Sequence, residues 1–156
     1  MQSKHNLNED LNLRPGHEKD SKFIYLVKKT TLRSYIEQTW GSWDEKFQDS
    51  RHNKNFISEV YQIIQYKGID IGVQKIQEDN ESVEIDIIEI LPEYQNKGIG
   101  TQLLNNIISF SRQKNKIVSL QVLKANTRAI KLYKHLGFQV INENDTHLKM
   151  KLLKMS

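Results

Sequence analysis

Two kinds of apolar periodicity alternate along the chain. Between Phe23 and Ile36 the apolar residues recur at the spacing of one helical face, and Gly41 follows as a terminator. Ile99 begins a second helical face, while Asn126 and Gly137 bracket a third helix as N-cap and C-terminal glycine. Shorter segments that are alternating or continuously apolar are typical of strands. The pattern predicts helices over 21–40, 44–56, 98–114 and 127–136, and strands over 11–14, 60–66, 69–76, 83–91, 117–123, 138–141 and 148–153.

The order of these elements, β-α-α-β-β-β-α-β-α-β-β, defines one mixed α/β domain. The 156 residues fit a single domain that buries its own core without disulfide or metal crosslinks. Residues 1–9 are polar and show no periodicity. This predicts a disordered tail over 1–9 and a single domain over 10–156.

Composition excludes several kinds of chemistry. The chain has no cysteine, which excludes disulfides, thiolate metal sites and a cysteine nucleophile. Its five histidines are scattered, and we expect no metal site. No apolar run approaches the roughly 20 residues of a membrane span. Because the N-terminus is polar throughout, we expect no secretory signal there. We therefore expect a cytoplasmic protein that does not associate with membranes.

Charge is distributed unevenly around a net value of +4. Residues 78–93 carry seven acids and no Lys or Arg, whereas residues 95–141 carry eight Lys or Arg and no acid. The basic segment favours an anionic ligand, and a merely solvated surface is the simpler alternative. A nucleic-acid-binding surface would need interleaved aromatic residues, but Phe110, Tyr133 and Phe138 each fit a core or motif position. We expect no nucleic-acid partner.

The segment IEILPEYQNKGIGT, from Ile88 to Thr101, joins the end of a strand to a helix that opens with Gly-x-Gly. Backbone N–H groups at a helix N-terminus attract phosphate, and Gly98 and Gly100 leave room for its close approach. A dinucleotide-binding loop would place a third glycine where Leu103 stands, and a nucleotide P-loop would need Gly-Lys-Ser/Thr. Neither pattern is present. A Gln-x-x-Gly-x-Gly phosphate loop remains, beside the alternative of a structural turn that starts a helix.

A second segment, LKANTRAIKLYKHLGF from Leu123 to Phe138, lies one predicted strand further on. The two segments together resemble the coenzyme-A-binding core of the GCN5-related N-acetyltransferase (GNAT) family. The resemblance covers residues 83–140, and the N-terminal third is similar only in its order of elements. It is carried by Gln95, Gly98, Gly100, Asn126, Ala129, Leu132, Tyr133, Gly137 and Phe138.

The resemblance implies the acyl-CoA N-acyltransferase fold. This is a mixed, mostly antiparallel sheet of about seven strands, splayed between the fourth and fifth, with about four helices. Acetyl-CoA would lie in the gap as co-substrate, and its acetyl group would pass directly to a primary amine in a ternary complex. The implied cofactor-binding residues are Ile90, Leu91, Gln95, Asn96, Lys97, Gly98, Ile99, Gly100, Thr101, Asn126, Arg128 and Tyr133.

Three acids on the fourth strand are candidates for accepting a proton from the amine. Glu84 matches the position of a catalytic glutamate in several family members, and Tyr133 matches the tyrosine that points at the sulfur. Asp86 shares a face with Glu84 in an unbroken strand, whereas Glu89 lies on the opposite face. A bulge in this strand would change that assignment. Backbone N–H groups near Ile90 and Leu91 would stabilise the oxyanion.

The acceptor site would be shaped by the first two helices. Tyr35, Trp40, Trp43 and Glu89 are its candidate residues, as a pocket for a cationic amine. The alternative is that the two tryptophans only pack the helices together. The acceptor is expected to be a small-molecule or peptide amine, and the protein a monomer or homodimer. A catalytically inactive CoA-binding sensor or interaction domain is the alternative function.

Overall fold

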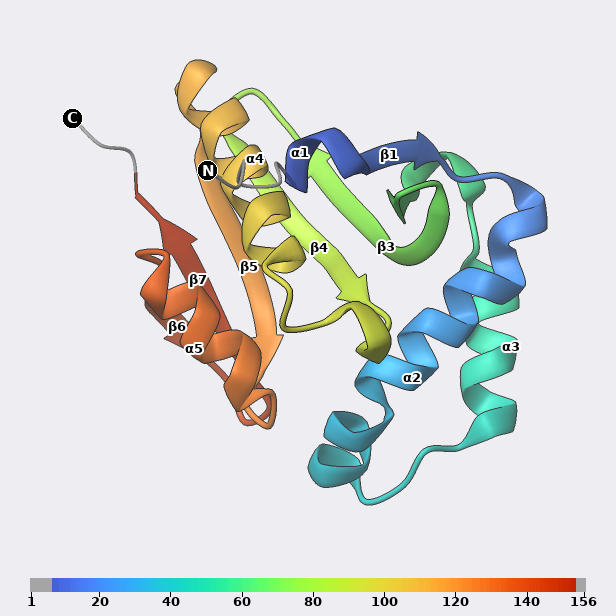
Figure 1. The fold of residues 1–156 in the computed structure, drawn as a ribbon. Coiled ribbons are helices and arrows are strands. Elements are labelled where there is room, and N and C mark those ends of the chain that lie inside the picture. Colours follow the sequence, from blue (N-terminus) through green and yellow to red (C-terminus); the bar gives the residue numbers. More distant parts are fainter. Residues whose placement is uncertain (1–6, 154–156) are drawn as a thin grey trace.

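Seven strands form one sheet in the order β1-β2-β3-β4-β5-β7-β6, with helices on both faces (Figure 1). The computed structural model describes residues 7–153. The strands are β1 (Leu11–Pro15), β2 (Gln62–Tyr66), β3 (Ile69–Glu78), β4 (Ser82–Ile90), β5 (Ile117–Leu123), β6 (Gln139–Glu143) and β7 (His147–Leu152). The helices are α1 (Leu7–Asp10), α2 (Ser21–Trp40), α3 (Glu45–Asn55), α4 (Ile99–Gln113) and α5 (Thr127–His135), with 3-10 turns η1 (Glu18–Asp20), η2 (Ser58–Val60) and η3 (Pro92–Tyr94). The predicted α/β fold and mixed sheet are confirmed.

The short helix α1 departs from the predicted disordered tail. It includes residues 7–9 of that tail. The carbonyl oxygen of Asp10 accepts a hydrogen bond from the Lys67 amide at 2.9 Å, which attaches the end of α1 to the β2–β3 turn. The remainder of the predicted tail, residues 1–6, lies outside the described residues.

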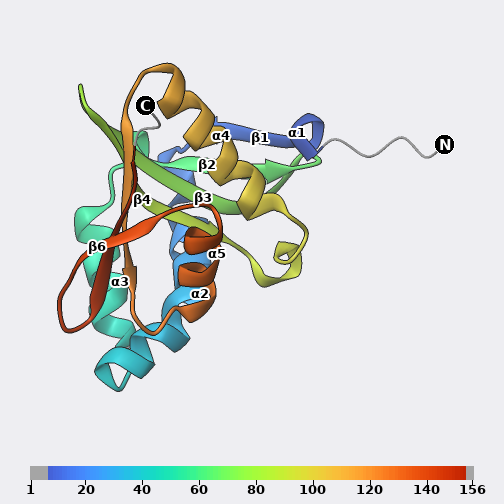
Figure 2. The ribbon, with the colours of Figure 1, turned by 90° about the vertical axis from the view of Figure 1, so that its left-hand side faces the viewer.

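The helices form two layers around the sheet. Ile24 and Val27 of α2 are fully buried against β2 and β3 on one face. On the other face, α4 and α5 pack over a larger core that includes Leu104 of α4 and Met150 of β7. Figure 2 shows α4 and α5 on the same side of the sheet. The sheet is thus enclosed where α2 and α4 face each other across its centre.

The strands β4 and β5 diverge in the middle of the sheet. They pair in parallel over only four residue pairs, from Ser82–Ile117 to Ile85–Leu120. Beyond Ile85, β4 continues to pair with β3 as far as Ile90, while β5 pairs with β7 as far as Leu123. The predicted splay between the fourth and fifth strands is confirmed, and it opens toward the start of α4.

Asp86 is the extra residue of a β-bulge in β4. Ile87 pairs with Lys75, and Ile85 pairs with the next residue of β3, Ile76. Asp86 between them has no partner on β3, which is the pattern of a bulge. A bulge shifts the alternation of side chains by one residue.

This shift decides which acids of β4 share a face. Ile85 before the bulge and Ile88 after it both contact the cores beneath α4. Glu84 and Glu89 therefore both point to the opposite face, toward the α2 layer. The prediction that Glu89 lies on the face opposite Glu84 is wrong, because it assumed an unbroken strand.

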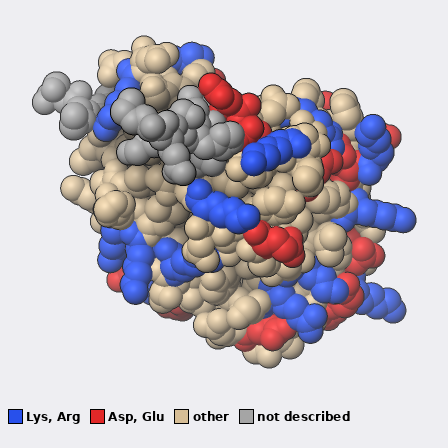
Figure 3. Space-filling model, in the orientation of Figure 1, with Lys and Arg blue, Asp and Glu red and all other residues tan. Residues whose placement is uncertain are grey.

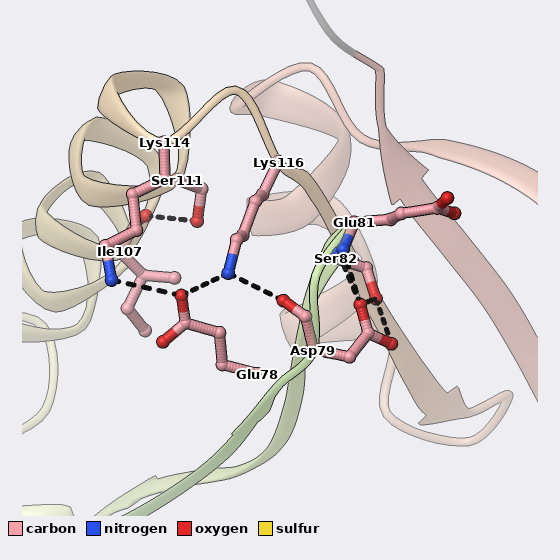
Figure 4. Close-up of polar contacts among 8 residues, drawn as sticks. All are labelled: Glu78, Asp79, Glu81, Ser82, Ile107, Ser111, Lys114 and Lys116. Atoms are coloured by element: carbon pink, nitrogen blue, oxygen red, sulfur yellow. Dashed lines mark hydrogen bonds and ion pairs between the residues drawn. The ribbon is translucent and has the colours of Figure 1, made fainter.

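Charged residues hold the closed end of the splay together (Figure 4). Glu78 Oε2 lies 2.5 Å from Lys116 Nζ and 3.2 Å from Lys114 Nζ, and Lys116 also donates to the Asp79 carbonyl at 2.6 Å. The Asp79 carboxylate accepts hydrogen bonds from the backbone N–H groups of Glu81 and Ser82. The turn before β4 is thus attached to the segment that leads into β5.

These contacts also change how the uneven charge distribution along the sequence is interpreted. Lys114 and Lys116 of the basic segment neutralise Glu78 of the acidic one. Lys124 likewise lies 2.8 Å from the Glu143 carboxylate. Figure 3 shows charges of both signs interspersed over the face it presents. Part of the basic segment therefore serves to close the fold.

Residues 7–153 contain no helix with the length and apolar character that crossing a membrane requires.

The close approach of β3 and β4 generates a prediction. A Cβ atom on Gly72 would lie 2.3 Å from the Glu89 carbonyl oxygen, so we expect Gly72→Ala to cost about 2 kcal/mol of unfolding free energy. Gly100→Ala is the control, because its Cβ would meet only Ile90 Cδ1 at 3.7 Å. Urea denaturation checks both variants. Equal stabilities would contradict the tight pairing of Gly72 with β4.

Candidate active site

A pocket of about 300 Å³ lies on the side where β4 diverges from β5, between β4 and α5. It is reached by residues from α2, β4, the loop before α4, α4 itself and α5. Its lining consists of Thr31, Tyr35, Ile88, Glu89, Ile90, Gln95, Asn96, Gly98, Gly100, Thr101, Leu104, Asn126, Arg128, Ala129, Leu132 and Tyr133. Most of the residues predicted from the two sequence motifs are therefore brought together.

The first turn of α4 forms one end of the pocket. Gly98, the N-cap of α4, has φ 84°, a left-handed conformation that glycine adopts without strain. The backbone N–H groups that follow have no partner within the helix and carry partial positive charge. The fold itself would accept a side chain at residue 100, since an added Cβ would meet only a side-chain atom at 3.7 Å. Glycine there keeps the pocket open at the helix terminus.

The end of β4 presents unpaired backbone groups to the pocket. The Leu91 N–H donates to the Ile71 carbonyl at 2.8 Å, so it is occupied within the sheet and is not an oxyanion donor as predicted. Because hydrogen-bonded and non-bonded pairs alternate in an antiparallel ladder, the polar groups of Ile88 and Ile90 point away from β3. The Ile90 carbonyl accordingly accepts from Gln95 Nε2 at 2.8 Å. The Ile90 N–H remains the candidate oxyanion donor.

Arg128 links the two sequence motifs across the mouth of the pocket. Its Nη1 donates to Gln95 Oε1, and its Nη2 donates to Asn96 Oδ1 at 2.7 Å. Asn96 holds a positive φ of 62°, which turns the loop toward α4. A guanidinium beside a helix N-terminus is a strong site for phosphate oxygens.

Three predicted cofactor residues lie outside the pocket lining. Leu91 packs with the core under α2, and Ile99 is 1% exposed in the core under α4. The Lys97 ammonium lies 5.6 Å from the centroid of the Tyr94 ring. Ile99 begins α4 between Gly98 and Gly100, which both line the pocket.

The helix α5 contributes Asn126 and Tyr133. The Asn126 side chain accepts from the Ala129 N–H at 3.1 Å, so the predicted N-cap is confirmed. The Tyr133 ring packs 5.7 Å from that of Phe138, and Tyr133 lines the pocket. Burial and the nearby Glu89 carboxylate raise the pKa of the Tyr133 hydroxyl above its ordinary value. It is therefore a protonated donor at neutral pH.

Glu89 is the carboxylate that the fold places in the pocket. Desolvation raises its pKa to about 7, and a hydrogen bond with Thr31 of α2 opposes part of that shift. A carboxyl with a pKa near neutrality exchanges protons readily at physiological pH. Thr31 was missed in the sequence, although it is a polar residue at helical spacing from the buried Ile24 and Val27.

Glu84 and Asp86, predicted as catalytic, lie elsewhere. They line a separate depression of about 300 Å³ with Ile85, Gln121 and His147. Asp86 accepts a hydrogen bond from Gln77 at 2.6 Å and lies 3.9 Å from Lys75 Nζ. Neither acid lines the pocket that holds Tyr133.

The predicted acceptor residues are divided. Tyr35 lines the pocket beside Glu89. Trp40, 58% exposed at the end of α2, has its ring 6.3 Å from that of His147, beside the depression that holds Glu84. Trp43 instead donates to Glu45 at 2.6 Å and packs near Tyr25, so it joins α2 to α3.

Comparison with known proteins agrees with this geometry. The model of the acetyltransferase (GNAT) family matches residues 30–138. An uncharacterised N-acetyltransferase of Methanocaldococcus jannaschii is 32% identical over 108 residues, which are 67% of this chain and 48% of that protein. The chain spans about half the length of this relative, and 34% of each of two further curated relatives.

Solved structures share the fold. The PaiA N-acetyltransferase of Thermoplasma acidophilum, in complex with coenzyme A, superposes with a TM-score of 0.72 at 18% identity, covering 93% of this chain and 99% of that one. The spermidine N-acetyltransferase of Vibrio cholerae, in complex with CoA and spermine, gives 0.62 at 23% identity, covering 92% and 95%.

A splayed mixed sheet with a Gly-x-Gly helix terminus at the gap defines the class of acyl-CoA N-acyltransferase folds. The matched family model extends over most of the domain. This chain belongs to the GNAT acetyltransferase family.

The raised pKa of Glu89 generates a prediction about stability. Between its ordinary value of 4.5 and about 7, the folded protein holds a proton that the unfolded chain releases. Stability from this group is complete below the lower value and is lost as pH rises through the upper one. We expect Glu89→Gln to raise the unfolding free energy by about 1–3 kcal/mol near pH 8, with little effect near pH 4. Thermal melts at both pH values check this.

Proposed function

We propose that this protein transfers the acetyl group of acetyl-CoA to a primary amine, by direct attack within a ternary complex. The observation that carries the proposal is a single pocket that joins three features. These are the N-terminus of α4, the open edge of β4, and the pair formed by Glu89 and Tyr133.

The residues present fit coenzyme A. Backbone N–H groups at Gly98–Gly100 and the Arg128 guanidinium offer donors for a diphosphate. The Ile88 and Ile90 backbone offers the edge of a strand to the amide groups of the pantetheine arm. Leu132 and Ala129 form an apolar wall on the α5 side. When bound, acetyl-CoA supplies the thioester that is attacked.

Proton transfer would use the two titratable groups of the pocket. Glu89 accepts a proton from the acceptor ammonium, which frees the nitrogen lone pair to attack the thioester carbonyl. The Ile90 N–H stabilises the oxyanion that forms. When the carbon–sulfur bond breaks, Tyr133 donates its proton to the leaving thiolate, and the proton that the nitrogen loses on becoming an amide returns to Tyr133. The raised pKa of Tyr133 keeps the hydroxyl proton in place until sulfur becomes basic.

The acceptor would approach between α2 and β4. Tyr35 and Thr31 flank Glu89 on that side. The spermidine acetyltransferase with a similar fold acts on a small amine, which supports a small-molecule or peptide amine as the acceptor class. Because the amine attacks acetyl-CoA directly, no acyl-enzyme intermediate is needed. The chain also has no cysteine that could form one.

Cofactor binding is tested by calorimetric titration with acetyl-CoA and with CoA. Gly100→Asp places a carboxylate at the helix terminus, and we expect it to weaken binding by roughly 100-fold through repulsion of the diphosphate. The control Gly100→Asn has a similar size without the charge and should lose less affinity. Absence of wild-type binding at high micromolar concentration would overturn the proposal.

The identity of the base is tested by pH–rate profiles, once a screen of amines by thiol release supplies an acceptor. We expect kcat/KM to rise with pH through an apparent pKa of about 7, because only the ionised carboxylate accepts a proton. Glu89→Gln should lower kcat by roughly 100-fold and remove this limb. Glu84→Gln is the matched control and should retain the wild-type kcat and the rise of kcat/KM with pH. If the pH–rate profile of Glu89→Gln equals that of the wild type, Glu89 is not the base.

A further inference from the structure

A second cavity is lined by the middle of α4 and by residues of β1, β2 and β3. Figure 2 shows α4 crossing this part of the sheet. We call this cavity the α4 groove. It has a volume of about 480 Å³, within the range of small-molecule sites. Among the described residues, none lines both the α4 groove and the pocket that holds Glu89. Its apolar walls are Leu11, Leu13, Ile76, Leu103, Ile107 and Phe110.

Two facing glutamines interrupt these apolar walls, and Asn12 and Asn106 complete the polar lining. Gln62 of β2 and Gln74 of β3 are direct partners in the sheet. Gln74 is only 2% exposed, and its Nε2 donates to Gln62 Oε1 at 3.1 Å. Its Oε1 is buried and accepts no hydrogen bond from the described residues. Burying an amide oxygen without a donor costs free energy that an apolar residue would not.

The pair has unused hydrogen-bonding capacity of both kinds. Gln74 Oε1 offers an acceptor, and the Gln62 amide nitrogen donates to no side chain within residues 7–153. If the oxygen and nitrogen positions of both side-chain amides are exchanged, one glutamine still offers a free acceptor and the other a free donor. A group that both donates and accepts, side by side, would satisfy the pair.

The charge of the groove lining further restricts the class of ligand that fits. No Lys, Arg, Asp, Glu or His is found among the described residues that line the α4 groove. An ionised ligand would lose its hydration there without gaining a counter-charge. The ligand must therefore be neutral, with an apolar body for the walls formed by α4 and β1.

We propose that the α4 groove binds a small uncharged molecule through a carboxamide or lactam group. Its N–H donates to Gln74 and its carbonyl accepts from Gln62, while its apolar body packs against Leu103, Ile107 and Phe110. Ligand binding in the α4 groove does not require acetyl transfer, so the test of this proposal is separate from the test of the proposed function.

The test is a titration of the ¹⁵N-labelled chain with benzamide and δ-valerolactam, followed by NMR. We expect saturable shifts in the side-chain amide resonances of Gln62 and Gln74. The charged analogues benzoate and benzylamine should bind about tenfold more weakly or worse. Equal shifts with charged and neutral probes, or saturable shifts confined to other residues, would overturn the proposal, as would the absence of saturation.

Variants separate ligand binding from a structural role. Gln74→Leu should reduce the affinity for benzamide by about tenfold while melting at or above the wild-type temperature. The control Gln113→Leu changes a glutamine exposed near the end of α4, outside the groove, and should bind like wild type. If Gln74→Leu does not fold, Gln62→Leu gives the same test from the exposed side of the pair. Undiminished binding in the folded variant contradicts the proposal.

Discussion

The parting of β4 from β5 is the constraint on which the site depends. The two strands are held together at one end by four residue pairs and by the ion pairs of Glu78 with Lys114 and Lys116. Beyond that end, the sheet leaves the polar backbone of Ile88 and Ile90 without a neighbouring strand. Buried backbone groups must be paired, so this edge needs water or a ligand. The pocket is therefore a consequence of how the sheet is closed.

The bulge at Asp86 then determines which acid enters the pocket. Without the extra residue, Glu89 would face the core under α4, where an ionised carboxylate has no partner. With it, Glu89 turns toward α2 and meets Thr31, while burial brings its pKa to about 7. One inserted residue thus places a candidate base under α2, while Glu84 and Asp86 of the same strand line a separate depression.

The helix α4 contributes to both cavities. Its first turn provides unpaired N–H groups at the pocket that holds Glu89, and Leu103, Ile107 and Phe110 line the groove with the glutamine pair. Its buried face also joins the two cores on that side of the sheet. A ligand in the α4 groove would therefore contact the same helix whose first turn lines the pocket that holds Glu89.

The sequence by itself determined the order of elements, because apolar period, caps and turn residues act over a few neighbours. Asn126 caps its helix as predicted, Asp44 caps α3, and Gly41 ends α2. It also determined the loop at Gly98–Gly100, whose spacing is local. Only the tertiary structure decided the rest. The register shift at Asp86, the occupation of the Leu91 N–H by Ile71 and the burial of Glu89 all depend on partners distant in the sequence. Periodicity along one strand carries no information about a bulge, which arises only when two strands are paired.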